Sequence, residues 1–300
     1  MSSFIRSSAF VAGATLLFAG AAWADPYAFS TGNPDGRIAV ASRPDAGGKT
    51  EREAADDFVT TAQTTITSAT FTGLFVGLPG AGAPTLGDVA IEIYRVFPND
   101  SNTVRAPNVP TRVNSPSDVA FDSRDSATAG QLSFSTAVLS TSFTASNSVL
   151  NGINPKPNQT TGGEGAVTGS EVQFTINFAI PFVLPADHYF FVPQVQLTNG
   201  EFYWLSAPKP IVAPGTPFPA GFTDLQSWVR SDALDPDWLR VGTDIVGGQT
   251  PPTYNQAFSL TGTVAAVPEP ESCALMLTGL AGISVFARRG RRGTRETRGA

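Results

Sequence analysis

The most regular stretch of the sequence is EVQFTINFAI, residues 171–180. Its apolar residues occupy every second position from Val172 to Ile180, and polar or small residues fill the positions between them. Successive side chains of a β-strand point to opposite faces of a sheet. The alternation therefore predicts a long strand with one buried face.

Patterns of the same kind recur along the chain, because Val89, Ile91 and Ile93 also occupy every second position. Further predicted strands cover residues 57–61, 64–76, 131–144, 189–197, 201–206, 226–230 and 257–264. No apolar pattern of helical period and useful length occurs between residues 25 and 266. About nine strands separated by polar turns predict an all-β fold, an antiparallel β-sandwich or jelly roll.

Turn residues separate the predicted strands. The pair Asn199-Gly200 tolerates the positive φ angles of a tight turn, and it predicts a hairpin between the two strands that flank it. Two longer segments, residues 98–118 and 207–221, predict loops. The second holds five prolines, and proline cannot donate to the hydrogen-bond ladder of a sheet.

The N-terminus predicts a secretory signal peptide over residues 1–24. A short segment with one positive charge, Arg6, precedes the apolar run AFVAGATLLFAG. Ala22-Trp23-Ala24 has the A-x-A form of a signal-peptidase cleavage site, which places the mature start at Asp25. The folded part is then expected to cover residues 25–266.

The C-terminus carries three features in order. Pro268-Glu269-Pro270 comes first, and an apolar run over residues 273–287 follows it. Four arginines come next: Arg288, Arg289, Arg291 and Arg292. The apolar run is short for an ordinary transmembrane helix, which needs about 20 residues. Arginines behind a hydrophobic stretch hold that end of the chain in the cytoplasm.

This arrangement over residues 267–300 resembles the PEP-CTERM sorting signal of Gram-negative bacteria. The resemblance implies a C-terminal transmembrane sorting helix and processing by exosortase, a membrane protease-transpeptidase. It also implies a transient inner-membrane tether, then delivery to the cell surface or extracellular matrix, with exopolysaccharide or biofilm as the setting. The partners implied are signal peptidase, exosortase and extracellular polysaccharide. A plain C-terminal anchor that is never cut is the alternative.

The folded part has a second resemblance. Four short strings carry it, among them Ala55-Asp56-Asp57-Phe58 and Tyr203-Trp204, and they are similar to exported β-sandwich domains of PEP-CTERM proteins. This resemblance implies a fold and no activity.

The charge of the chain and its few cysteine and histidine residues limit the classes of partner and metal site that it can have. The whole chain has 19 basic and 25 acidic residues, and removing both ends leaves 12 basic and 22 acidic residues. Such an acidic domain repels phosphate backbones, so nucleic acid is not expected as a partner. The only cysteine, Cys273, lies in the tail, and the only histidine is His188. A disulfide and a multi-histidine metal site are therefore excluded, and no cofactor is expected, with calcium left open.

Candidate binding residues are few. Four acidic residues are candidate calcium ligands: Asp232, Asp235, Asp237 and Asp244. They do not match the calcium-loop motif, and Asp235-Pro236-Asp237 can equally form a capped turn. Tyr203, Trp204 and Trp228 are candidate glycan-binding residues because aromatic rings stack on sugars, although large aromatic residues in strands more often lie in the core, as we expect for Trp204.

No catalytic constellation is recognisable in the sequence. Adjacent strand residues point to opposite faces, so Asp187 and His188 are not expected to form a dyad, and His188 is expected near a strand edge with a satisfied hydrogen bond. We therefore expect a non-enzymatic exported protein. A carbohydrate- or calcium-binding matrix module and a polysaccharide hydrolase or lyase are the alternatives.

Overall fold

The structure is a computed structural model that describes residues 24–104, 112–153, 160–234, 237–266 and 278. The strands are β1 (Asp25–Ser30), β2 (Ala39–Ala41), β3 (Arg52–Thr60), β4 (Thr64–Gly77), β5 (Thr85–Arg95), β6 (Asp122–Asp125), β7 (Leu132–Ala145), β8 (Ser148–Val149), β9 (Val167–Leu184), β10 (Asp187–Thr198), β11 (Gly200–Ala207), β12 (Trp228–Ser231), β13 (Leu239–Arg240), β14 (Asn255–Gln256) and β15 (Phe258–Val264). Two short helical turns, η1 (Asp232–Leu234) and η2 (Val241–Val246), lie between the later strands.

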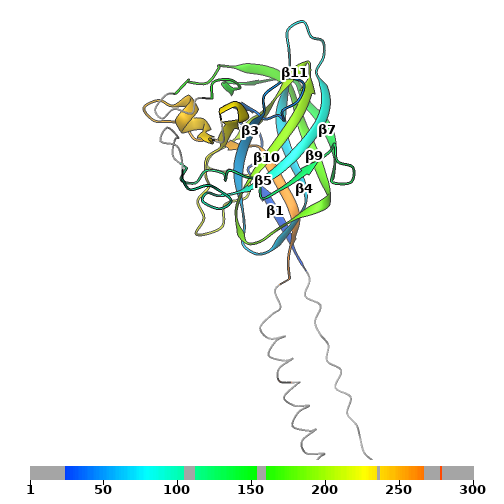
Figure 1. Cartoon of the computed structure of the whole chain (residues 1–300), viewed down its shortest axis with the longest axis vertical. Helices are drawn as coiled ribbons and strands as arrows, with labels where there is room; N and C mark the ends of the chain where they lie inside the picture. Colours follow the sequence, from blue (N-terminus) through cyan, green and yellow to red (C-terminus); the bar gives the residue numbers. More distant parts are fainter. Residues whose placement is uncertain (1–23, 105–111, 154–159, 235–236, 267–277, 279–300) are drawn as a thin grey trace, which may run out of the picture. The chain divides into compact units, whose positions relative to one another are not determined.

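These strands form two sheets (Figure 1). The larger has nine strands and follows the order β1-β15-β4-β11-β2-β8, with β14 beside β11, β9 beside β4, and β7 beside β9. The smaller has six strands in the order β13-β12-β3-β10-β5-β6. Nearly all strand pairs are antiparallel, and β2 with β8 is the parallel exception among the described strands. The mostly-β fold is confirmed, and the two sheets are consistent with a β-sandwich.

The long predicted strands are confirmed, in most cases within a few residues at their ends. The alternating stretch that decides the fold lies inside β9, which pairs with β4 on one side and β7 on the other. In β9, Val172, Phe174, Ile176 and Phe178 are buried, as the alternation predicts, whereas Ile180, expected on the same buried face, is 51% exposed. The strands that sequence analysis missed include several of two or three residues, which are too short to show any period.

The hairpin predicted at Asn199-Gly200 is wrong. Asn199 has a positive φ of 58°, so the turn itself forms, but β10 belongs to the six-stranded sheet and β11 to the nine-stranded sheet. Gly200 pairs with Gly77 of β4, and a Cβ at Gly200 would lie 2.9 Å from the Val76 carbonyl oxygen. Asn-Gly indicates the local backbone angle and does not specify which strands pair. Here the turn carries the chain from one sheet to the other.

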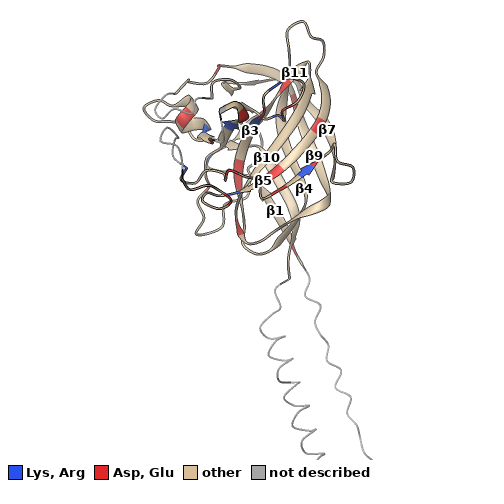
Figure 2. Ribbon diagram, in the orientation of Figure 1, with Lys and Arg blue, Asp and Glu red and all other residues tan. Residues whose placement is uncertain are grey.

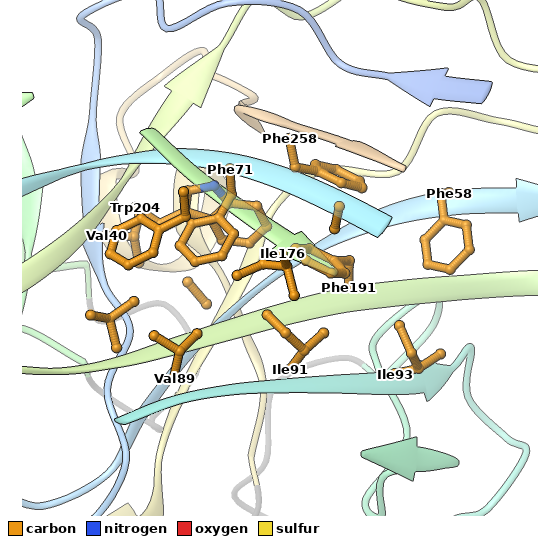
Figure 3. Close-up of a cluster of buried hydrophobic side chains, with 14 of the residues drawn as sticks. Val40, Phe58, Phe71, Val89, Ile91, Ile93, Ile176, Phe191, Trp204 and Phe258 are labelled. Carbon is orange, nitrogen blue, oxygen red and sulfur yellow. The ribbon is translucent and has the colours of Figure 1, made fainter. Parts of the chain in front are cut away.

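The core fills the space between the two sheets with aromatic and branched side chains (Figure 3). Phe71 and Phe174 stack with ring centroids 4.6 Å apart, and Phe191 and Phe258 stack at 5.1 Å. Phe191 comes from the six-stranded sheet and Phe258 from the nine-stranded sheet, so this second stack joins the two layers. Such contacts account for the high phenylalanine content of the chain.

The two ends of the folded unit lie side by side. Contacts define one compact unit over Asp25–Ala265, and Asp25 at the start of β1 pairs with Val264 at the end of β15. The expected signal peptide, its cleavage residue Ala22, and the sorting residues of the tail lie outside the described residues, whereas the cleavage residue Ala24 directly precedes β1. No helix of the described part of the chain has the length and apolar character to cross a membrane.

Candidate functional site

Polar residues gather on the face of the six-stranded sheet that points away from the core. In β3, Ala54 and Phe58 belong to the core between the sheets, whereas Ala55 belongs to a second hydrophobic cluster on the opposite face. Strand alternation places Glu53 and Asp57 on the same face as Ala55. Figure 2 shows charged residues thinly scattered over the strands, so this concentration of acids on one strand stands out.

Glu53, Glu92, Tyr94 and Arg230, here called the acid–tyrosine cluster, share one buried network. The Tyr94 hydroxyl lies 2.8 Å from Glu53 Oε1 and 2.7 Å from Glu92 Oε2. Arg230 donates from Nη2 to the same hydroxyl at 2.8 Å and from Nε to Glu53. A hydroxyl holds a single proton and can donate to one carboxylate, so the second carboxyl group must carry a proton of its own.

The electrostatics identify Glu92 as the protonated member of the acid–tyrosine cluster. Burial, and then the charge of Glu53, raises the pKa of Glu92 to about 8. Glu53 is almost fully buried and is compensated by Arg230, whose guanidinium lies over the rings of Tyr94 and Trp238 at 5.2 and 4.7 Å. The network therefore has one carboxylate, one carboxylic acid and one cation.

A second pair joins the buried Asp57 to the half-buried His188. His188 Nε2 lies 2.6 Å from Asp57 Oδ2, and the same oxygen accepts a 3.0 Å hydrogen bond from the backbone N–H of Leu225. Burial raises the pKa of Asp57 to about 6, against the opposing effect of the hydrogen bond from His188. The preceding Asp56 is fully buried and accepts from the Gln256 backbone N–H, and burial holds its pKa well above the usual range.

The side-chain partner of His188 is Asp57, which no feature of the sequence indicates. The adjacent Asp187 accepts from the His188 backbone N–H through Oδ1 at 2.8 Å. Asp57 lies on the neighbouring strand β3, and the sequence gives no local signal for a pair 131 positions apart. His188 lies near the start of β10, a strand between β3 and β5, and its hydrogen bond is satisfied.

The aromatic candidates are all buried. Trp204 lies in the core with 0% of its surface exposed, and Tyr203 belongs to a separate buried cluster behind the nine-stranded sheet. Trp228 is 1% exposed and lies in the cluster that covers the outer face of the six-stranded sheet. None of the three presents an open ring face on which a sugar could stack.

Asp232, Asp237 and Asp244, the calcium candidates among the described residues, do not form a metal-binding group. Both carboxylate oxygens of Asp244 are bonded by Arg240, and Asp232 is exposed in η1. Asp237 is buried, and Asp235 lies outside the described residues. Within the described ranges, no group of three or more histidine, cysteine or acidic side chains could hold a metal ion.

A cavity of about 340 Å³, here called the Trp228 pocket, is lined in part by Leu225, whose backbone N–H donates to Asp57. Asn114 and Thr253 are exposed at its rim, and Lys209, Asp224 and Gln226 line it between rim and floor. The buried side chains of Leu225 and Trp228 form its floor. The hydrogen bond from the Leu225 backbone N–H to Asp57 fixes the floor of the pocket to β3. The buried acid therefore helps to shape the pocket.

Comparison with protein families, with curated proteins and with solved structures found no match to this chain.

The acid–tyrosine cluster makes stability depend on pH. The pKa of Glu92 is about 8 in the folded protein against 4.5 ordinarily, so the folded state holds this proton more tightly. That contribution to stability is complete below about pH 4.5 and is lost as the pH rises through 8, by the order of a few kcal/mol. We expect the melting temperature to fall between about pH 5 and pH 9, and Glu92→Gln, a neutral mimic of the acid, to flatten the decline. Asp45→Asn at an exposed position should leave the slope unchanged. A wild-type protein that gains stability over this range would contradict the assignment.

Proposed function

We propose that the chain is a non-enzymatic exported protein, delivered to the cell surface or extracellular matrix through a processed C-terminal sorting tail. One observation carries the proposal: the folded unit Asp25–Ala265 coincides with the segment between the two targeting segments of the sequence. Strand β1 begins at Asp25, the expected first residue after signal cleavage, and β15 ends two residues before Ala266. Neither end of the fold needs residues that export would remove.

The pairing of β1 with β15 also fits a folded unit that the C-terminal tail alone attaches to the membrane. Because Asp25 lies opposite Val264, the mature N-terminus is held by the strand that precedes the tail. Cleavage after Ala24 would leave β1 in place, since six residues of β1 are paired with β15. The folded unit would then be complete on the outer side of the membrane while the tail holds it there.

The C-terminal tail contains both the arginines that stop the chain from crossing the membrane and the segment at which it is cut. Each arginine costs about 2.5–3.5 kcal/mol at the centre of a bilayer, so Arg288, Arg289, Arg291 and Arg292 resist crossing. Pro268-Glu269-Pro270 precedes the apolar run, and proline biases the residues before it towards extended backbone, which suits a peptidase. The resemblance to PEP-CTERM signals assigns this cleavage to exosortase, and it assigns the destination to a matrix that contains exopolysaccharide.

Replacing Pro268-Glu269-Pro270 with three alanines should leave the tail uncut, because the segment that the peptidase recognises is gone. In a host that has exosortase, we expect the variant to accumulate in the inner-membrane fraction and the wild type to leave it. The matched control changes a proline of the folded unit, the exposed Pro79, to alanine, which should not alter fractionation. Equal fractionation of the wild type and the triple-alanine variant would contradict processing at this segment.

A further inference from the structure

One edge of the nine-stranded sheet is formed by β7 and is open. Among the described residues, β9 is the only strand that pairs with β7, and it lies on one side of it. The backbone N–H and C=O groups on the other side of β7 are therefore outside the hydrogen-bond ladder of the sheet. From Ser135 to Leu139, five successive side chains are exposed, so neither face of the strand is covered there. An open edge of this kind is a template to which a further strand can pair.

The other edges of the two sheets are protected against such pairing. β8, β13 and β14 have two residues each, which is too short to hold another strand. β6 has four residues, of which three are charged, and β1 contains Asp25 and Pro26. Short length, charge and proline are the means by which proteins keep sheet edges from pairing. β7 is the exception among the described edge strands, since it has 14 residues without a charge or a proline.

The regular part of this edge is Leu132–Val138. Over these residues β7 keeps one register with β9, and irregularities interrupt the register after Val138. Bulges twist a strand and disturb its ladder, so the second half of β7 is less suited to pairing. The residues of β9 opposite the regular part, Val172–Phe178, carry no charge either. Two copies of a domain with 12 basic and 22 acidic residues therefore repel each other less at this edge than over the rest of their surfaces.

The sequence of the regular part suits pairing with a second copy of itself. Antiparallel pairing about Ser135 places Leu132 of one copy opposite Val138 of the other, and Phe134 opposite Thr136. These four side chains lie on the core-facing side of β7, because their partners on β9 all belong to the core. Val138 is 62% exposed although Val172 beside it is 1% exposed, so a second copy would cover apolar surface that the fold leaves open.

We propose that β7 pairs with β7 of a second copy of this chain, antiparallel about Ser135, so that the two nine-stranded sheets become continuous. Each copy offers the same residues to the other, and the interface closes as a two-fold dimer. Main-chain hydrogen bonds supply the affinity, as they do wherever a strand is added to an open edge. A single pair of strands is a small interface, so the association is weak and depends on concentration. The inference concerns the folded unit and does not depend on the proposed export.

A disulfide trap tests both the pairing and its register. Directly opposite residues of an antiparallel pair have Cα atoms about 4.5–5.5 Å apart, which is within the range that a disulfide spans. In the full-length chain with Cys273→Ser, purified in detergent, we expect Ser135→Cys to form disulfide-linked dimers under mild oxidation. The matched control is Ser123→Cys, which should stay monomeric because Ser123 is exposed on the charged edge strand β6.

Sedimentation of the full-length chain in detergent tests the edge without a cross-link. We expect the wild type to shift from monomer to dimer as its concentration rises. Ser135→Lys should remain monomeric with an unchanged melting temperature, because two lysines would lie directly opposite each other. Ser123→Lys should dimerise as the wild type does.

Three results would overturn the proposal. The first is a wild type that stays monomeric, even if the edge takes up a strand of another protein. The second is a Ser135→Lys variant that dimerises as the wild type does, since the copies would then meet elsewhere. The third is a Ser135→Cys variant that cross-links no more than Ser123→Cys.

Discussion

Replacing Trp204 with alanine is expected to destabilise the fold by about 3–5 kcal/mol. Trp204 is fully buried between the sheets, and its ring packs against Phe191 and Phe258 with centroids 5.9 and 5.7 Å away. Truncation removes these contacts and leaves a cavity that the surrounding strands cannot close. It also removes one of the two hydrogen bonds that the Ala257 carbonyl accepts, since the bond from the Thr72 backbone N–H remains. Urea unfolding followed by circular dichroism measures the change.

The control for Trp204 is an apolar residue on the surface. Val138 in β7 is 62% exposed, and Val138→Ala should change stability by no more than about 0.5 kcal/mol. If Trp204→Ala unfolds at the same urea concentration as the wild type, Trp204 is not the core residue that the structure shows.

Replacing Arg230 with methionine is expected to cost about 3–5 kcal/mol, because it leaves a buried charge without its partner. Glu53 is 1% exposed, and Arg230 is the cation that faces it. Methionine retains much of the apolar stem of arginine, so the loss reports on the charge more than on packing. Thermal melting at neutral pH measures the effect.

Arg95 provides a matched control for Arg230. It also pairs with a carboxylate, Asp100, and lies over an aromatic ring, Phe121, but the two members of the ion pair are 30% and 29% exposed. An exposed pair contributes about 0–1 kcal/mol, so Arg95→Met should have a small effect. Similar losses for Arg230→Met and Arg95→Met would contradict a buried acid–tyrosine cluster.

The strands were predictable from the sequence because they are long and alternate. In β9, one face meets the core from Val172 to Phe178, and the apolar period records that face over these residues but not at the exposed Ile180. Pairing was less predictable, as the turn at Asn199 shows: its backbone angle follows from local chemistry, whereas the sheet that β11 joins depends on contacts with β4 and β2.

The polar clusters were not predictable, since their members are distant in the sequence. Tyr94 and Arg230 meet because β5 and β12 lie in the same sheet, and no spacing in the sequence reports that. Trp228 was a glycan-binding candidate only because of its residue type. Its place in the lining of a cavity depends on the loop that carries Lys209 and Asp224, which the sequence does not place beside it.

The most direct test of the proposed function is the intact mass of the protein recovered from the surface of a host that has exosortase. The account predicts a chain that begins at Asp25 and lacks residues 288–300. A surface protein that still carries Arg288, Arg289, Arg291 and Arg292 would contradict sorting and indicate an ordinary anchor. A chain that begins at Met1 would contradict export by signal cleavage.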